Sequence, residues 1–574
     1  MKFGSRTSNW LSRLVMTVSI LVSVTAFAAP NLPDPANLPR IETQPSPPVI
    51  VSPKIEQKED SNYPAVMSET SDIKVKVEHL KFTGNKNVSN TELTALLSPY
   101  LGLSLGIKEL HQMTALVTRY YRQLGYMLAE AYLPEQDITQ NTLEIAVVEG
   151  YLGELRMQSK GGLDEAFLKK MASRDLANKD VIRESNLVKN ITLINSLPGI
   201  KAISELSPGA DVGYSDVEIE VQALPLLTGY LGANTYGNRF TGRETLIAGL
   251  FFNNLAGRGD RLGLNLKDSN GERQRSAQVG YSVPIHESGT ILNLNAGYSD
   301  YRLGGEFSKL DAFGQSSYQS VFLDQPVLRS RQGNITSRIG FSHKDISDDV
   351  SAFSLKNHRG INAIEFGLFG DWRDSLWKGF NQLGLNLKFA EVDLKNSLAQ
   401  SLDDAGAKTA GNFVKYSLFG SRIQPLNPMF NLILRAEYQG TDKNLDSTEN
   451  LAIGGINRWR EFGELPTSSD RGLIAGIELR RSMLPMTTLA SFLPILKSAE
   501  TSPYAFFDYG RGIIDHSALS NNNHVNSAHC GIGIDIQFAK KWMLDLAASH
   551  QRSKVEGVDS ESETRVWGQI RAEF

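Results

Sequence analysis

Apolar and polar side chains alternate at period two in segment after segment from Thr228 to the C-terminus. Successive side chains of a β-strand point to opposite faces, so the alternation predicts strands with one apolar and one polar face. In the final segment, one face carries Val566, Gly568, Ile570, Ala572 and Phe574, and the other carries Arg565, Gln569, Arg571 and Glu573. Strands with lipid on one side and water on the other are typical of outer-membrane β-barrels.

The number of such segments predicts the size of the barrel. Well-defined alternation occupies residues 262–267, 292–297, 383–389, 432–439, 473–480 and 542–549. At about 22 residues for each strand and its loop, residues 225–574 hold about 16 antiparallel strands, within the even-numbered range of outer-membrane barrels. A barrel of this size conducts unless something fills its lumen.

The N-terminus predicts export from the cytoplasm. Three basic residues precede an apolar run over residues 14–27, which ends in the small-residue triplet Ala26-Phe27-Ala28, so residues 1–28 are predicted to be a secretory signal peptide. No later stretch reaches the ~18 apolar residues of a membrane-spanning helix. If the mature chain is embedded in a membrane, it must therefore be a barrel.

Between the signal peptide and the barrel, the pattern predicts a linker and two modules. Residues 29–72 are rich in proline and polar residues, which predicts a flexible or semi-extended linker. Residues 73–150 have the pattern strand, helix, helix, strand, strand, and residues 151–224 repeat it, with a helix predicted over 179–197. Two tandem α+β modules of this size favour binding rather than catalysis.

Several motifs in these modules resemble a known family. The chain is similar to the outer-membrane transporters of two-partner secretion, the hemolysin-secretion and filamentous-hemagglutinin-export group of the Omp85 superfamily. The first module resembles that family's first POTRA domain in Phe82-Thr83-Gly84-Asn85, Tyr120 to Tyr126, Leu133 to Gln136 and Val148-Glu149-Gly150. The second module matches the family in Leu197-Pro198-Gly199, Leu206 to Gly209 and Gly213 to Asp216.

Two further motifs of the superfamily occur in the barrel. The segment Gly454 to Phe462 resembles the motif of the long sixth loop, in which the double glycine Gly454-Gly455 precedes a tip with an arginine, here Arg460. Trp459 and Glu461 replace the valine and glycine of that tip. The segment Phe506-Phe507-Asp508-Tyr509-Gly510 matches the Phe-x-Asp-x-Gly strand motif.

The resemblance implies that the loop, residues 440–471, folds into the lumen and that Arg460 and Phe462 lock it to Asp508, with Phe506 and Gly510 completing the strand motif. The alternation agrees, since it places Asp508 on the polar face with Phe506 and Gly510. Removing one partner of such a buried ion pair costs roughly 3–5 kcal/mol. The alternative is that Arg460 is an ordinary exposed arginine of the loop. The terminal Phe574 is predicted to act as an outer-membrane assembly signal.

Enzyme, metal and nucleic-acid functions find little support. Gly102-Leu103-Ser104-Leu105-Gly106 matches a nucleophile elbow, but a helix precedes it and the module is too small for the required sheet. His524, His529 and Cys530 fit no tight metal motif, and both histidines are predicted to lie in an extracellular loop. The single Cys530 excludes an intramolecular disulfide and is predicted to face lipid. The net charge of −4 predicts no nucleic-acid partner, and no cofactor is expected.

We therefore expect an outer-membrane pore whose POTRA modules, in the periplasm, bind an unfolded exoprotein for passage to the cell surface. The resemblance implies a β-helical partner of hemolysin, adhesin or contact-dependent inhibitor type, and haem-scavenging cargo is also open. Outer-membrane lipid and, during biogenesis, the barrel-assembly machinery are further expected partners. An assembly or insertase factor of the same superfamily and a small-solute porin are the alternatives. Proline in the linker argues against a helical plug, but a segment such as Lys54 to Glu59 could enter the lumen.

Overall fold

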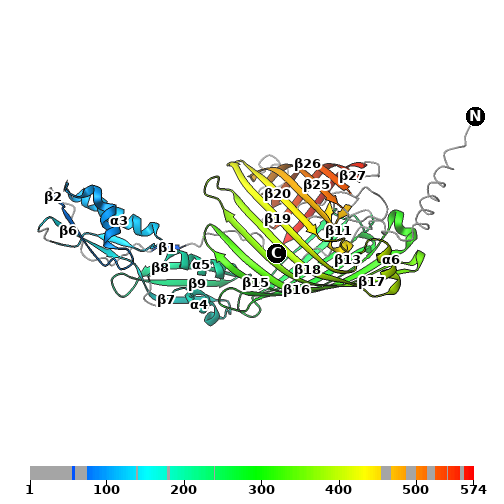
Figure 1. The fold of residues 1–574 in the computed structure, drawn as a ribbon, viewed down its shortest axis with the longest axis horizontal. Coiled ribbons are helices and arrows are strands. Elements are labelled where there is room, and N and C mark those ends of the chain that lie inside the picture. Colours follow the sequence, from blue (N-terminus) through cyan, green and yellow to red (C-terminus); the bar gives the residue numbers. More distant parts are fainter. Residues whose placement is uncertain are drawn as a thin grey trace, which may run out of the picture.

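The computed structural model describes residues 55–57, 74–136, 140–176, 181–237, 240–453, 467–485, 499–513, 524–539, 541–555 and 561–574. The predicted signal peptide and most of the predicted linker lie outside these residues. Figure 1 shows two small α+β modules at one end of a large β-barrel, with helix α6 (Ser397–Ala405) at the opposite end. Within the described residues, no helix is long and apolar enough to cross a bilayer.

The first module has the predicted order of elements. Helix α2 (Asn90–Leu97) begins at a capping box, in which the Ser89 hydroxyl accepts from the Glu92 amide and the Glu92 carboxylate accepts from the Ser89 amide. Helix α3 (Ile107–Gln123) buries Leu110, Met113 and Val117. The other elements are β2 (Val75–Lys76), β3 (His79–Thr83), η1 (Ser98–Tyr100), β4 (Ser104–Leu105), β5 (Glu130–Tyr132) and β6 (Thr142–Val148).

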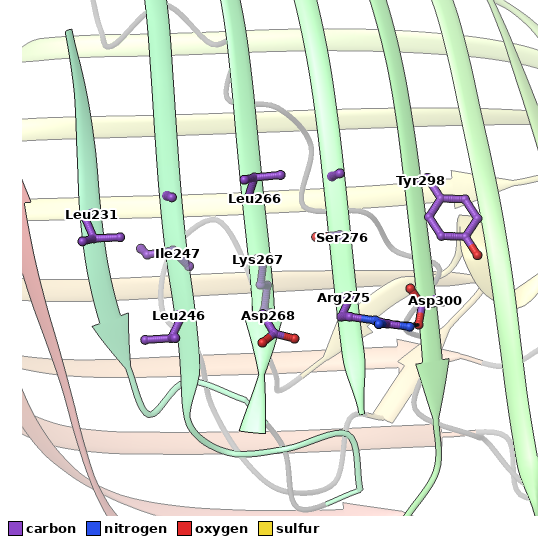
Figure 2. A pocket seen from close by; sticks show the side chains of 12 residues that line it. Leu231, Leu246, Ile247, Leu266, Lys267, Asp268, Arg275, Ser276, Tyr298 and Asp300 are labelled. Atoms are coloured by element: carbon purple, nitrogen blue, oxygen red, sulfur yellow. Dashed lines mark hydrogen bonds and ion pairs between the residues drawn. The ribbon is translucent and has the colours of Figure 1, made fainter. Parts of the chain in front are cut away.

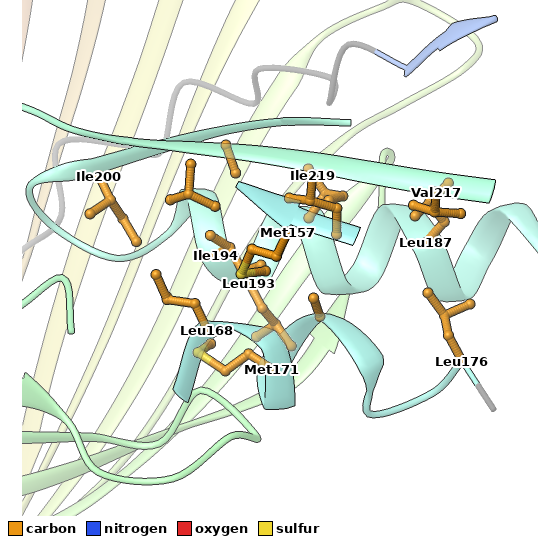
Figure 3. Close-up of a cluster of buried hydrophobic side chains, with 14 of the residues drawn as sticks. Met157, Leu168, Met171, Leu176, Leu187, Leu193, Ile194, Ile200, Val217 and Ile219 are labelled. Atoms are coloured by element: carbon orange, nitrogen blue, oxygen red, sulfur yellow. The ribbon is translucent and has the colours of Figure 1, made fainter. Parts of the chain in front are cut away.

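The second module packs two helices on one sheet, whose strand order is β1-β8-β9-β7. Its elements are β7 (Tyr151–Lys160), α4 (Glu165–Ser173), α5 (Glu184–Asn195), β8 (Ile200–Pro208) and β9 (Tyr214–Ala223). Figure 3 shows Leu168 and Met171 of α4 facing Leu193 and Ile194 of α5 beneath the sheet. Burial of each such side chain contributes about 1.5–3 kcal/mol.

The second helix of this module begins later than the sequence predicts. Helix α5 starts at Glu184, whereas the prediction started it at Lys179, which lies outside the described residues. Val181 instead bridges Tyr151, and the Ile182 amide donates to the Gly150 carbonyl oxygen, so the chain is extended here. Backbone pairing with a neighbouring strand therefore delays the helix.

A strand from the predicted linker completes the sheet of the second module. Strand β1 (Ile55–Gln57) runs parallel to β8, with Ile55 opposite Ser204 and Gln57 opposite Leu206. The suggestion that Lys54 to Glu59 enters the lumen is thus wrong for the residues that the structure describes. An open strand edge offers hydrogen-bonding backbone groups, and β1 uses them.

Sixteen antiparallel strands close into the barrel, as the alternation predicts. β28 pairs with β10, and β23 and β24 form one strand because both pair with β25. The strands are β10 (Leu227–Asn234), β11 (Thr245–Asn253), β12 (Arg261–Ser269), β13 (Gln274–Pro284), β14 (Ile291–Arg302), β15 (Ala312–Arg329), β16 (Gly333–Val350), β17 (Leu355–Arg373), β18 (Phe380–Leu394), β19 (Gly411–Asn427), β20 (Phe430–Thr441), β23 (Arg471–Arg481), β24 (Leu484–Pro485), β25 (Glu500–Ile513), β26 (His524–Phe538), β27 (Trp542–Val555) and β28 (Glu561–Glu573).

Side chains of the barrel alternate between the outer face and the lumen. On β20, Leu434 and Tyr438 are exposed outward, whereas Ile433 and Gln439 are buried. Cys530 of β26 is exposed on the outer face, as predicted. An apolar outer face and a polar inner face fit a wall between lipid and a wet lumen.

Short turns of the barrel hold the second module in place. The Asp164 amide donates to the Gly257 carbonyl oxygen in the turn between β11 and β12, and Arg258 of that turn binds the Asp164 carboxylate at 2.9 Å. Arg331, in the turn between β15 and β16, binds Glu184 of α5 at 2.7 Å. The end of the barrel with short turns is therefore the end that carries the modules.

Candidate functional site in the barrel lumen

The connection between β20 and β23 is the sixth of the loops at the end opposite the modules, and it folds back into the barrel. It occupies residues 442–470, of which 442–453 and 467–470 are described. A short helix η5 (Ser447–Glu449) precedes β21 (Leu451–Ile453), which pairs antiparallel with β22 (Thr467–Ser469). Ile453 and Ser469 are fully buried, so this hairpin lies against the inner wall.

Two glycines of β25 allow the hairpin to lie directly on the wall. A Cβ atom at Gly510 would lie 2.6 Å from Ile453 Cγ2, and one at Gly512 would overlap both Ile453 and Ser469. Any side chain at these positions would push the hairpin away from β25. Close packing of the hairpin therefore requires a glycine at position 510 of the strand motif, which the sequence alone does not reveal.

Asp508 lies on the same inner face of β25, two positions before Gly510. It is 9% exposed, whereas the flanking Phe507 and Tyr509 point outward. Its neighbour across the pair of strands β23 and β25 is Gly476, whose missing side chain leaves room for the carboxylate. The fold thus presents the buried carboxylate of Asp508 beside the hairpin of the sixth loop.

Four residues of the predicted lock, Gly454, Gly455, Arg460 and Phe462, lie outside the described residues. The described hairpin brings Ile453 onto Gly510, on the face of β25 that carries Asp508. The pairing of Arg460 with Asp508 therefore remains a prediction.

Phe506, the first residue of the strand motif, belongs to an aromatic cluster on the inner wall. It is 5% exposed and packs with Tyr504 and Trp567. Gly531 and Gly533 on β26 leave space for the Phe506 and Tyr504 rings respectively. This cluster joins β25 to β28 beside Asp508 and stiffens the wall at that point.

Glu449 is a site residue that the sequence analysis missed. It ends η5, is 3% exposed, and binds the ammonium groups of Lys344, Lys388 and Lys415. Alternation does place Lys388 on the polar face of residues 383–389, but no local pattern pairs it with a glutamate 61 residues away. Only the folded loop brings these charges together.

The prediction for the two histidines is wrong. His524 and His529 both lie on strand β26, not in a loop, and His529 is buried opposite Asp508 in the register. Cys530 points to the other face, so alternation separates it from His529. The described residues contain no group of three side chains placed to hold a metal ion.

The C-terminal residue takes part in closing the barrel. The Gly229 amide donates to the Phe574 carbonyl oxygen at 2.9 Å, and the Phe574 amide donates to the Gly229 carbonyl oxygen at 3.0 Å. The Phe574 side chain is 54% exposed on the outer face. Its role as an assembly signal remains a prediction.

A hollow on the outer face of the barrel has no connection with this site. Figure 2 shows it between Leu231, Leu266 and Tyr298, with Arg275 and Asp300 paired at 2.9 Å at one side. Small side chains at Ala248 and Ala277 form its floor. Its position on the apolar face makes it part of the surface that contacts lipid.

A closed antiparallel barrel with a loop folded into a polar lumen, preceded by α+β modules, defines a membrane transporter of the Omp85 type. A sequence profile of the POTRA domain, ShlB-type, matches residues 75–150. A profile of the haemolysin secretion/activation protein ShlB/FhaC/HecB matches residues 213–536, more than half of the chain. The chain belongs to this ShlB/FhaC/HecB family.

Individual relatives agree with the family. The heme/hemopexin transporter protein HuxB of Haemophilus influenzae is 27% identical over 499 residues, 86% of each chain. The outer membrane transporter CdiB of Dickeya dadantii is 23% identical over 412 residues, 69% of this chain and 70% of CdiB. The solved structure of CdiB from Escherichia coli has the same fold, with a TM-score of 0.68 at 21% identity over 89% of this chain and 93% of that one.

The protein is thus a two-partner secretion transporter of the outer membrane, which translocates exoproteins, and it is not an enzyme. The modules lie at its periplasmic end. The loops at the opposite end, including the sixth loop, are extracellular in origin.

Proposed function

We propose that the cargo is one large unfolded exoprotein, of the kind that folds into a β-helix at the cell surface. HuxB, named for heme and hemopexin, matches this chain over 86% of its length, whereas the CdiB of Dickeya dadantii matches over 69%. Together with the higher sequence identity to HuxB, 27% against 23%, this supports a cargo concerned with haem or hemopexin over a contact-dependent inhibitor.

Residues 73–150 and 151–224 act in this proposal as two POTRA modules that capture the cargo by strand addition. Strand β8 pairs with β9 along all nine of its residues but with β1 along only three. Backbone hydrogen bonds to such an edge supply affinity with little demand on side-chain sequence. An extended cargo segment that pairs along more of β8 would displace the short strand β1.

The sixth loop closes the resting pore, and Arg460 and Phe462 hold its tip at Asp508. The double glycine Gly454-Gly455 gives the chain the freedom to turn at the end of the hairpin. This part of the proposal is supported by the buried position of Asp508 and by the packing of Ile453 on Gly510. A guanidinium fits a desolvated carboxylate better than an ammonium does, because its fork can donate two hydrogen bonds.

Passage through the pore draws its free energy from the cargo. The sequence contains no phosphate-binding glycine loop. Folding of the exoprotein outside the cell buries a core that it lacked in transit, which makes passage directional. Contacts with outer-membrane lipid and recognition of Phe574 by the barrel-assembly machinery complete the proposed partners.

Mass spectrometry of surface and secreted proteins tests this function. Three strains are compared: one with the wild-type chain, one without it, and one with a chain lacking residues 74–223. We expect one large protein to disappear from the surface and the medium in the second and third strains, which also identifies the cargo. A joint fall of many outer-membrane proteins would instead indicate an assembly factor, and solute uptake that survives removal of the modules would indicate a porin.

A further inference from the structure

The root of the sixth loop, residues 446–449, is held by buried charges from the barrel wall. The Glu449 carboxylate lies 2.8 Å from Lys344 Nζ of β16 and 2.8 Å from Lys388 Nζ of β18, and it also binds Lys415 of β19. Lys344 donates to the Thr448 carbonyl oxygen at 3.1 Å and Lys415 donates to that of Glu449 at 3.0 Å. Three strands therefore bind the Glu449 side chain, and two of their lysines also bind the backbone of Thr448 or Glu449.

A second buried ion pair holds the same segment. Arg359 of β17, 3% exposed, binds the Asp446 carboxylate of the loop and, at 2.5 Å, that of Asp348 of β16. Asp446 also accepts hydrogen bonds from the amide and hydroxyl of Thr448, which fixes the turn of η5. Four consecutive strands, β16 to β19, thus bind the root through Asp446, Thr448 and Glu449.

The other limb of the loop is fixed at the same level. The Asp470 carboxylate accepts from the Leu445 amide at 2.8 Å, and Gln439 of β20 donates to the carbonyl oxygens of both Glu449 and Asp470 at 3.1 Å. Residue 470 is directly followed by β23 of the wall. Both limbs of the hairpin therefore start from points tied to the barrel.

The charges of this cluster show that Glu449 is needed to balance the lysines of the wall. Three ammonium groups face two carboxylates, since Lys388 also lies 3.6 Å from Glu365. Among the described residues, loss of the Glu449 charge would leave three cations, of which Lys388 and Lys415 are buried, against the carboxylate of Glu365. Breaking a buried ion pair on one side is strongly destabilising, because the remaining charges stay desolvated and repel one another. The lysines would then turn to lumen water, and the loop would leave the wall.

We propose that Glu449 is a positioning residue for export: it keeps the root of the sixth loop, and with it the hairpin of β21 and β22, on the inner wall of the barrel, where the hairpin narrows the lumen. Glu449 and Ile453 are four residues apart, which limits their separation to about 14 Å. The hairpin can therefore swing about its root but cannot leave the lumen. This inference rests on the proposed closure of the pore by the sixth loop, although the pore can be tested without any cargo.

The experiment measures single-channel conductance of the full-length protein in planar bilayers and export of the cargo from cells. Glu449→Gln keeps the shape of the side chain and removes its charge. Glu437→Gln is the matched control, because Glu437 also faces the lumen from β20 and has no described ion pair among the residues that the structure covers. We expect Glu449→Gln to raise conductance and lower export several-fold, with barrel levels in the membrane unchanged, and we expect Glu437→Gln to match the wild type.

Two more variants keep the test decisive. Glu449→Gln with Lys415→Gln restores the original excess of one positive charge, so conductance should return toward the wild-type value. If Glu449→Gln does not reach the membrane, Lys415→Gln alone, which keeps the carboxylate with two lysines, should give an intermediate rise. A correctly inserted Glu449→Gln or Lys415→Gln barrel with wild-type conductance would overturn the proposal, even if export were lower. If Glu449→Gln raises conductance but mass spectrometry identifies a different kind of cargo, this inference stands and the proposal for the cargo fails.

Discussion

At the scale of single residues, Glu149 of the motif Val148-Glu149-Gly150 accepts hydrogen bonds that join the two modules. Its side chain is fully buried at the junction of the two modules. It accepts hydrogen bonds from the amide and side chain of Asn87 at 2.7 Å, from Tyr121 at 3.0 Å and from Tyr151 at 2.9 Å. Burial and the Glu149 carboxylate raise the pKa of Tyr151 to about 12, so this phenol remains a donor at neutral pH. The residue joins both modules through one carboxylate.

Glu149→Ala should therefore loosen the modules. It leaves the buried Tyr121 hydroxyl without its acceptor, at a cost of about 1–3 kcal/mol, and removes the acceptor of the partly buried Tyr151 hydroxyl, so the free energy of unfolding should fall by about 3 kcal/mol. Protease cleavage within residues 74–223, measured on the full-length protein in detergent, should accelerate roughly a hundredfold because cleavage follows the open population. In the control Glu144→Ala, which removes a partly exposed pair with Lys81 and a hydrogen bond from the Thr83 hydroxyl, the change should be about 1 kcal/mol. Equal rates in both variants would contradict this role.

At the scale of elements, helix N-termini connect the second module to the barrel. Asp164 caps α4 by accepting from the Phe167 amide, and the same carboxylate binds Arg258 of a barrel turn. Glu184 begins α5 and binds Arg331 of another turn. Acidic residues at these positions interact favourably with the positive end of the helix dipole. Each ion pair is partly exposed, so each contributes only about 0–1 kcal/mol to the joint.

The joint should weaken in acid. The hydrogen bond from Phe167, followed by Arg258, holds the pKa of Asp164 below its usual value of 3.8. A lowered pKa in the folded state contributes stability that is complete above pH 3.8 and is lost as the pH falls through the folded-state value. Distances between spin labels on α4 and on the turn around Gly257 should therefore broaden below pH 4. Asp164→Asn should show the broad distribution at both pH 3 and pH 7, and unchanged distances across this range in the wild type would refute the prediction.

At the scale of the whole molecule, the sixth loop links the extracellular end of the barrel to an arc of its inner wall. Its root binds β16 to β19 through Glu449 and Asp446, and its hairpin lies on β25 through Ile453. Cargo that enters from the modules must pass this loop.

Arg460→Ala should leave the barrel inserted and lower export. The reason is that Asp508 loses the guanidinium proposed to hold the tip, while the root contacts remain. Heat-modifiable migration of the barrel in outer-membrane fractions reports insertion, and the amount of cargo in the medium reports export. Arg511→Ala, at an exposed outer position of the same strand β25, serves as the control and should change neither. Loss of the Arg460→Ala protein from the outer membrane would mark Arg460 as a folding residue instead.

The sequence by itself determined the barrel and the order of elements in the modules. Alternation has a period of two residues, so the local sequence of a strand predicts which of its side chains face outward. Leu434 outward and Gln439 inward follow from this pattern alone. The capping box at Ser89 likewise depends on residues three apart. Such features need no knowledge of distant segments, because the interactions that decide them lie within one element.

Only the tertiary structure decided which distant residues meet. Lys344, Lys388 and Lys415 reach Glu449 because strand register and the path of the sixth loop place them on one level of the wall. The linker strand β1 took the edge of β8 because unpaired backbone groups there accept any extended segment. The same dependence on partners put His529 on a strand instead of in a loop. Long-range pairing leaves no local pattern in the sequence, so these contacts had to be seen in the fold.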